Sequence, residues 1–198
     1  MRPPAARRAP IPRAAAVVVA LWAPYTALNT TFPGPFIAYG GGLALAGVAL
    51  VALRRAGLTR RDLGLRLAAP SRAGLAGLGL LCAFIPLALA LGRGQGWRPL
   101  DDLVFAPASA LGQELYFRAA LLPALVVVCR GRAPVALAGQ ALLFALWHLR
   151  AVRVVAPGPA LAVLLATGVG GLVWGWQVQR DRTVLYAAAQ HALFLAVQ

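Results

Sequence analysis

The chain has 198 residues, 61% of them hydrophobic, and a mean hydropathy of +0.75. Soluble domains are about 45–50% apolar, and a chain of this length has too little interior to hide so much apolar surface from water, so the composition predicts a membrane protein. The net charge of +14 does not indicate nucleic-acid binding, because the arginines stand in short clusters between apolar runs and form no basic stripe with interleaved aromatic residues.

We predict an all-α transmembrane bundle of about seven spans. Residues 1–13 form a basic, proline-rich segment, and residues 14–198 form a single transmembrane domain. The first apolar run, 14–29, has no clear small-x-small cleavage site, which favours an uncleaved span over a signal peptide. A turn at 30–35 follows it. The other spans are expected at about 36–53, 73–91, 104–128, 134–147, 159–178 and 183–197.

Prolines and glycines within these spans make local predictions. Pro86 predicts a kink in the third span, and Pro123 predicts that the fourth is kinked or divided. The runs Gly40-Gly41-Gly42 and Gly171-x-x-x-Gly175 predict close contacts between helices, because glycine lets neighbouring backbones approach.

The arginines predict an orientation. With seven spans and the N-terminus inside, 14 of the 19 arginines lie in inside segments and four in outside loops, and Arg118 lies within the membrane. The absence of lysine is typical of a GC-rich bacterial genome, so we expect an integral protein of the bacterial inner membrane with a cytoplasmic N-terminus. Cys82 and Cys129 lie in apolar runs without CxxC spacing, and we expect both to be small buried apolar residues.

Glu114 is the only glutamate, and it lies inside the apolar run of the fourth span, whereas the four aspartates fall in predicted loops. Arg118 follows one helical turn later on the same face. A carboxylate and a guanidinium are costly in a bilayer, which favours a functional pair. The alternative is a structural ion pair that locks two helices together.

Two histidines extend this group. His191 lies near the middle of the last span and His148 at the outer end of the fifth, so they can converge with Glu114 on the outer half of the bilayer. A carboxylate in a dry site can take a proton from water, and a histidine can stabilise an oxyanion or protonate a leaving amine, so the set favours hydrolysis by an activated water. His148 alone also suits an interfacial residue. A zinc site is the less favoured reading, since there is no HExxH motif and no i,i+4 histidine pair; we expect no metal and no cofactor.

The motifs carry a resemblance to a known family. Gln113-Glu114-x-x-x-Arg118, Phe144-x-x-x-His148 and a late His191 resemble the CPBP family, the CAAX protease and bacteriocin-processing (Abi) group of glutamic-type intramembrane proteases. The resemblance covers about residues 104–195. It implies a helical membrane protease in which glutamate activates water and histidines assist, acting on prenylated CAAX proteins, bacteriocins or sorting signals. Carried over by position, the matching site residues are Glu114, Arg118, His148 and His191.

Two positions depart from the family pattern. The first glutamate of the motif, the general base in the family, is Gln113 here, and the asparagine four residues after the last histidine is Leu195. We therefore expect an intramembrane endopeptidase in which Glu114 is the base, held by Arg118 and Gln113, with a membrane-anchored protein or peptide as substrate and membrane lipid as surroundings. The alternatives are an inactive membrane scaffold or immunity-type binding protein and, less favoured because no inverted repeat is visible, a proton-coupled transporter.

Overall fold

A computed structural model describes residues 10–31, 40–69, 71, 72, 74–76, 79, 104–150 and 157–196, without the side chains of Leu28, residues 157–159 and Ala196. The regular elements of the described part are all helices, and a single antiparallel bridge joins Leu65 and Thr183 at one end. Thr30 and Thr31, predicted to begin a turn, are the last residues of a helix. The rest of that turn, most of the third span with Pro86 and Cys82, and the loop that follows it lie outside the described residues.

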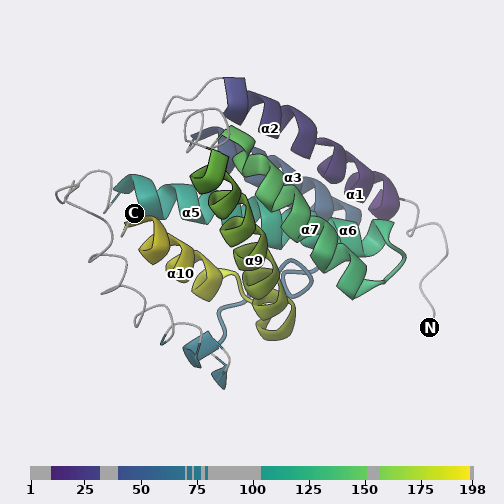
Figure 1. Cartoon of the computed structure of the whole chain (residues 1–198). Helices are drawn as coiled ribbons and strands as arrows, with labels where there is room; N and C mark the ends of the chain where they lie inside the picture. The colour runs from purple at the N-terminus through teal and green to yellow at the C-terminus, as the bar shows by residue number, and fades with distance from the viewer. Residues whose placement is uncertain are drawn as a thin grey trace, which may run out of the picture.

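The helices form one bundle around a long central helix (Figure 1). In chain order they are α1 (Pro10–Ala20), α2 (Trp22–Thr31), α3 (Gly42–Ala56), α5 (Ala106–Glu114), the π-helical η4 (Leu115–Leu121), α6 (Leu122–Val128), α7 (Ala133–Trp147), the 3₁₀ turn η5 (His148–Arg150), α9 (Pro157–Asp181) and α10 (Leu185–Ala196). The first helix thus begins at Pro10, not at 14, because proline is well suited to the first turn of a helix.

Three stretches among the described residues are long and apolar enough to cross a membrane: Pro10–Thr31, Ala106–Val128 and Ala160–Asp181. They correspond to the first, fourth and sixth predicted spans. Helices α3 and α7 have 15 residues each and α10 has 12. At about 1.5 Å per residue these three are shorter than the roughly 30 Å hydrocarbon core of a bilayer. The all-helical prediction is confirmed, and the count of seven spans is not.

The central helix runs through α5, η4 and α6 without a break, but its winding widens in the middle. Leu122 N donates to Phe117 O, five residues back instead of four. Pro123 follows at once; it has no N–H to donate and therefore cannot continue a regular ladder from the preceding turn. The predicted disturbance at Pro123 is thus a π-helical segment with Arg118 inside it.

Aromatic rings fix the central helix against its neighbours. Phe117 contacts Phe144 edge to face at 4.9 Å between ring centroids, and Tyr116 contacts Tyr25 in the same way at 5.4 Å. Tyr116 also donates its hydroxyl to Val18 O at 3.0 Å. These contacts join the first helix, the central helix and α7, and they bury the turn that carries Glu114 and Arg118.

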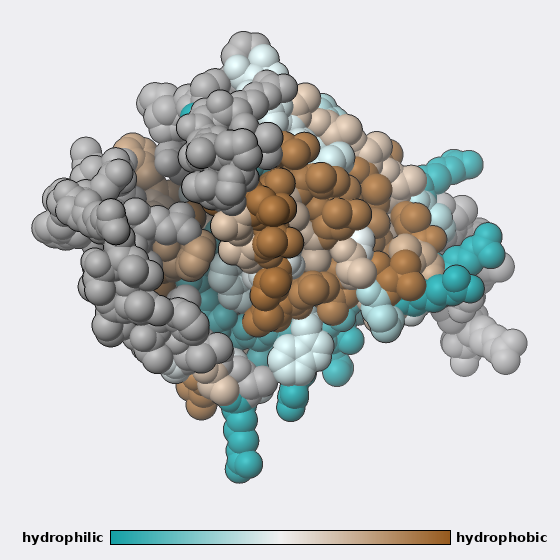
Figure 2. Space-filling view, in the orientation of Figure 1, coloured by the Kyte–Doolittle hydropathy of each residue, from teal (hydrophilic) through white to brown (hydrophobic). Residues whose placement is uncertain are grey.

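The close contact predicted at Gly171 and Gly175 is confirmed, whereas the prediction for Gly40-Gly41-Gly42 holds at Gly42 and not at Gly40, where a Cβ would meet nothing within 4 Å. A Cβ on Gly171 would lie 2.9 Å from Ala141 Cα, and one on Gly175 would lie 2.6 Å from Leu137 Cδ1, so α9 and α7 need glycine to approach this closely. A Cβ on Gly42 would lie 2.6 Å from the Tyr25 hydroxyl. Outside these contacts, α7 and α9 present a broad apolar face (Figure 2), as expected for a surface in contact with lipid.

Several basic segments meet at one end of the bundle, which we call the basic end: the start of α1, residues 57–69, residues 129–133 and residues 180–184. The Leu65–Thr183 bridge joins two of them, and Arg66 N donates to Arg182 O at 3.4 Å. The arginine-rich segments predicted for one side of the membrane therefore do share one end of the molecule. Two details differ from expectation: Cys129 is partly exposed there, and Asp181 is the last residue of α9 instead of a loop residue.

Candidate functional site

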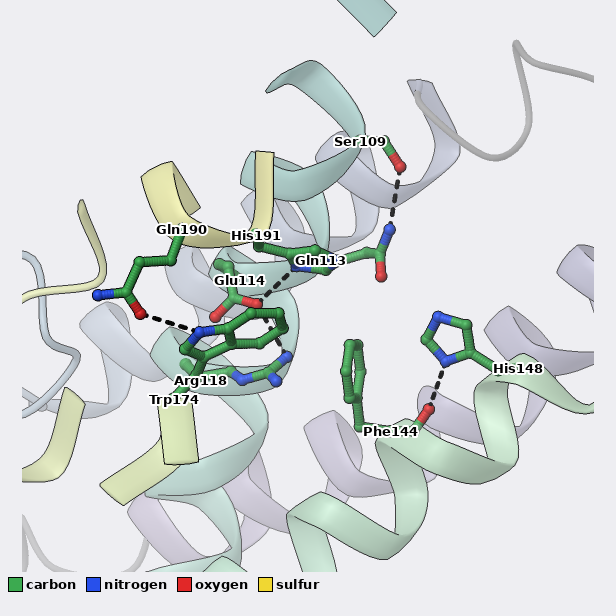
Figure 3. A network of polar contacts seen from close by, with 9 residues as sticks. All are labelled: Ser109, Gln113, Glu114, Arg118, Phe144, His148, Trp174, Gln190 and His191. Atoms are coloured by element: carbon green, nitrogen blue, oxygen red, sulfur yellow. Dashed lines mark hydrogen bonds and ion pairs between the residues drawn. The ribbon is translucent and has the colours of Figure 1, made fainter. Parts of the chain in front are cut away.

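Glu114 and His191 are brought together as the sequence predicts. His191 Nδ1 lies 2.9 Å from Glu114 Oε1, and Arg118 Nη1 lies 3.1 Å from the same oxygen (Figure 3). The Glu114 and Arg118 side chains are fully buried, and His191 is 3% exposed. A carboxylate can only accept, so in the ionised state of Glu114 the His191 Nδ1 carries the proton, which leaves Nε2 available to another group.

The three residues come from two helices that pack side by side. Glu114 ends α5 and Arg118 lies in η4, one turn further along the same helix, whereas His191 comes from α10, which packs against α5. Glu114 Oε2 has no hydrogen-bond partner. One oxygen of the carboxylate is thus held from two sides, and the other remains available for chemistry.

Arg118 is held by rings as well as by charge. Its guanidinium carbon lies 4.0 Å from the centroid of the Phe144 ring and 5.5 Å from that of Trp174. Its contact with Glu114 is an ion pair without a directed hydrogen bond, since none of its three nitrogens has a hydrogen-bond partner. The aromatic faces stabilise the cation in a part of the molecule that has little other polar surface.

His191 is also fixed on the side away from Glu114. Its ring stacks on the Trp174 indole at 4.7 Å between centroids and an angle of 23°. Trp174 in turn donates its Nε1 proton to Gln190 Oε1 at 3.0 Å, so the indole is anchored by the residue next to the histidine. Trp174 and Gln190 are not among the site residues predicted from the sequence. The sequence features that could have identified them are a large aromatic residue in a glycine-rich helix, for Trp174, and a polar residue next to the buried histidine, for Gln190.

His148 lies at the end of α7, in the first position of η5. Its Nδ1 donates to Phe144 O at 2.9 Å, and its ring contacts the Phe144 ring at 4.9 Å. Phe144 also lies against His191, at 5.9 Å between centroids. The end of α7 is tied to the first helix, because Asn29 Nδ2 donates to Trp147 O at 3.1 Å. His148 is therefore positioned beside the site, with Phe144 between it and the Glu114 pair.

Gln113 makes a different contact from the expected one. It donates Nε2 to Ser109 Oγ at 2.9 Å, one turn back along α5, and its Oε1 has no partner. Consecutive residues in a helix point about 100° apart, so Gln113 cannot share the face on which Glu114 meets Arg118. The carboxylate is held by Arg118 and His191, and Gln113 lies next to them in sequence without taking part in that pair.

Both histidines line an apolar cavity of about 440 Å³, which we call the imidazole cavity. Its other walls come from the first half of α9 and the end of α10. They comprise Phe144, Ala162, Val163, Ala166, Thr167, Gly170, Trp174, Phe194 and Leu195. Leu195, which stands where the family pattern has asparagine, thus does face the site, and it contributes an apolar surface there. Such a cavity suits an apolar segment of a substrate next to the imidazoles.

Among the described residues, no three His, Cys, Asp or Glu side chains are grouped so that they can hold a metal ion. The ionisable groups of the site are one carboxylate, one guanidinium and two imidazoles. Their arrangement supports proton transfer between a carboxylate and an imidazole in an enclosed, largely apolar site.

The long apolar helices and this buried polar site define the chain as an integral membrane protein. The family model described as "Type II CAAX prenyl endopeptidase Rce1-like" matches residues 95–197, just over half of the chain and the whole of the site described above. No curated protein and no solved structure matches the chain. The chain belongs to the Rce1-like CAAX protease family, which confirms the resemblance found in its motifs.

Proposed function

We propose that this protein is an intramembrane endopeptidase that cleaves a membrane-anchored protein or peptide with a water molecule activated by Glu114. The family is a family of proteases, and its type of substrate is anchored in the membrane. The observation that carries the proposal is the buried contact of Glu114 with His191 and Arg118, directly beside an apolar cavity that both histidines line.

The chemistry follows from the groups present. Glu114 takes a proton from water, and the water oxygen forms a bond to the carbonyl carbon of the scissile peptide. In their doubly protonated form, His191 and His148 keep the Nδ1–H bonds described above and donate Nε2–H to the oxygen that becomes negative in this step. The carbon–nitrogen bond then breaks as the proton passes to the leaving amine, so that one carboxylate and one amine are formed. Arg118 keeps the carboxylate oriented throughout. Gln113 only bonds to Ser109 within α5.

The orientation is part of the proposal. If the basic end faces the cytoplasm, as the arginine distribution favours, the imidazole cavity lies in the outer half of the bilayer. A substrate anchored in the membrane and awaiting sorting or maturation fits this position better than a cytosolic CAAX protein. A cysteine at position 148 that reacts only with reagents added from the cytoplasmic side would contradict this orientation.

The test is a pair of substitutions, Glu114→Gln and Gln113→Glu, scored by the processing of membrane-anchored proteins in the native host. Glutamine keeps the shape of Glu114 and an acceptor for Arg118, but it cannot take a proton from water. We expect Glu114→Gln to abolish processing while the protein still accumulates in the membrane, a loss of roughly 100-fold or more. The proposal fails if Glu114→Gln changes nothing and Gln113→Glu creates a new activity.

That second result would support an inactive member of the family that acts as a membrane scaffold or binding partner. Two observations favour this alternative. Gln113 replaces the first glutamate of the motif and is bonded to Ser109, and Leu195 gives the imidazole cavity an apolar wall where the family has asparagine. Purified protein that hydrolyses a peptide would exclude it.

A further inference from the structure

A second cavity, of about 470 Å³, opens at the basic end. We call it the basic-end cavity. Its walls are formed by α6, the end of α9, the loop 57–65 and the starts of α1 and α7. They comprise Ile11, Leu58, Asp62, Gly64, Arg118, Leu122, Pro123, Val126, Val127, Ala133, Val178, Gln179 and Arg182. We propose that it is a hydrated passage through which water reaches the Arg118–Glu114 pair, so that water and the apolar substrate approach the site from opposite ends of the molecule.

The position of Arg118 is the first argument. Arg118 lines the basic-end cavity, and it is ion-paired with Glu114. His191 lines the imidazole cavity, and it is bonded to the same carboxylate oxygen. Glu114 itself lines neither cavity and is fully buried. The carboxylate therefore lies between the two cavities and is linked to one through Arg118 and to the other through His191.

The unpartnered donors of Arg118 are the second argument. Nε, Nη1 and Nη2 are buried and none of them makes a hydrogen bond within the protein. A guanidinium has five N–H groups, and leaving them without acceptors in a dry site would cost several kcal/mol. These nitrogens are closed off from the cavity in this structure, so water, for which the cavity has room, supplies the missing acceptors by moving in past the Arg118 side chain.

The third argument is the contrast in lining. The basic-end cavity carries Asp62, Gln179 and Arg182 in addition to Arg118, whereas the polar groups of the imidazole cavity are the two histidines, Thr167 and the Trp174 indole. Asp62 is exposed and accepts from Thr59 N at 2.8 Å and Thr59 Oγ1 at 2.6 Å, so it is fixed where the cavity meets solvent. A charged opening attracts water and excludes an apolar segment, and a hydrolase whose substrate comes from the bilayer needs a separate supply of water.

The hydration itself is tested by cysteine labelling, which does not depend on any activity. The background lacks both native cysteines (Cys82→Ser, Cys129→Ser). The probe is Val126→Cys, which lines the basic-end cavity, and the matched control is Val135→Cys, on the apolar outer face of α7. Proteins in nanodiscs, with both faces accessible, are treated with an anionic and with a cationic water-soluble methanethiosulfonate.

We expect Val126→Cys to react with the anionic reagent roughly 10-fold or more faster than Val135→Cys, and faster than with the cationic reagent, because Arg118 and Arg182 favour anions. Arg182→Gln should reduce the preference for the anionic reagent, and Ala133→Trp, at the opening, should protect the cysteine. Equal labelling of Val126→Cys and Val135→Cys would overturn the proposal.

The supply of water to the reaction is the part that rests on the proposed function, and it has its own test. Ala133→Trp narrows the basic-end cavity far from the imidazole cavity, so we expect kcat to fall severalfold while KM for the membrane substrate stays unchanged. Val135→Trp, on the lipid face of the same helix, is the control and should change neither. If Ala133→Trp protects the cysteine but leaves kcat intact, water does not come this way. If no proteolysis is found with any variant, the proposed function fails, and the labelling still decides whether the cavity is hydrated.

Discussion

The imidazole cavity and the basic-end cavity are similar in volume but differ in their lining, although Arg118, Glu114 and His191 link them. The imidazole cavity is apolar, is built mainly by α9 and α10, and contains both histidines of the protein. The basic-end cavity is rimmed by charged groups and is built by loops and helix ends. The difference shows two separate uses of polar residues: those at the basic end suit orientation and solvent contact, and those at the imidazole cavity suit chemistry.

The largest effect on stability should come from breaking the link between the cavities. Arg118→Met leaves Glu114 buried without its cation, and we expect the free energy of unfolding to fall by about 3–5 kcal/mol. The double variant Arg118→Met/Glu114→Gln should recover most of this loss, because no buried charge is then left unpaired. Thermal unfolding of the purified proteins in detergent measures both. A single variant as stable as the wild type would show that the pair is not a buried ion pair.

On the imidazole side, His191→Ala should lower processing by roughly 100-fold without a matching loss of accumulated protein, since it removes the donor bonded to Glu114. Trp174→Phe is the matched variant: it keeps a stacking ring but loses the bond to Gln190, and we expect less than about a 10-fold decrease. Processing rates in host membranes distinguish the two. Similar losses in both variants would mean that His191 serves only as a packing partner.

The close contact between α7 and α9 holds the wall of the imidazole cavity. A Cβ on Gly171 would lie 2.9 Å from the Ala141 backbone, so Gly171→Val should lower the free energy of unfolding by about 1–3 kcal/mol. Gly47→Val, where a Cβ meets nothing within 4 Å, is the control. Unfolding in detergent is the measurement. Equal stability of the two variants would contradict the close packing described here.

The smallest effect belongs to Asp62 at the basic end. Its side-chain hydrogen bond with Thr59 lowers the pKa of the carboxyl below its usual value of 3.8. The folded state therefore holds this proton less readily than the unfolded state, so the stabilisation is present above about pH 4 and is lost as the pH falls through the folded-state pKa. Because Asp62 is exposed, we expect Asp62→Asn to cost less than about 1 kcal/mol at neutral pH, with the difference from the wild type vanishing in acid. A difference that does not shrink as the pH falls below about 4 would contradict this.

The features that the sequence could predict depend on the spacing of residues along a helix and on the small number of glutamates and histidines. Glu114 and Arg118 are one helical turn apart, so their pairing follows from the period of the helix. The contact with His191 joins residues 77 positions apart, and it was predictable only because the chain has one glutamate and two histidines to place. The basic segments share one end of the bundle because arginine-rich and arginine-poor segments alternate between successive helices along the chain.

The remaining features depend on tertiary packing. The stacking of Trp174 on His191 and its bond to Gln190 result from the approach of α9 and α10, and no local pattern specifies it. The π-helical winding of Leu115–Leu121 could not be predicted, since proline alone predicts only a disturbance. Apolar content predicted membrane spans at α3, α7 and α10, but these helices are too short to qualify as spans by length. Hydropathy does not show where a helix ends.

The most direct measurement takes membranes from a host strain that lacks this protein and incubates them, solubilised, with purified wild-type protein or with Glu114→Gln in water enriched in oxygen-18. Mass spectrometry then detects new peptide termini. Our account predicts new C-termini with solvent oxygen in the carboxylate for the wild type and none for Glu114→Gln. New termini that are equally abundant with Glu114→Gln, or that arise only with Gln113→Glu, would contradict the claim that Glu114 is the working carboxylate.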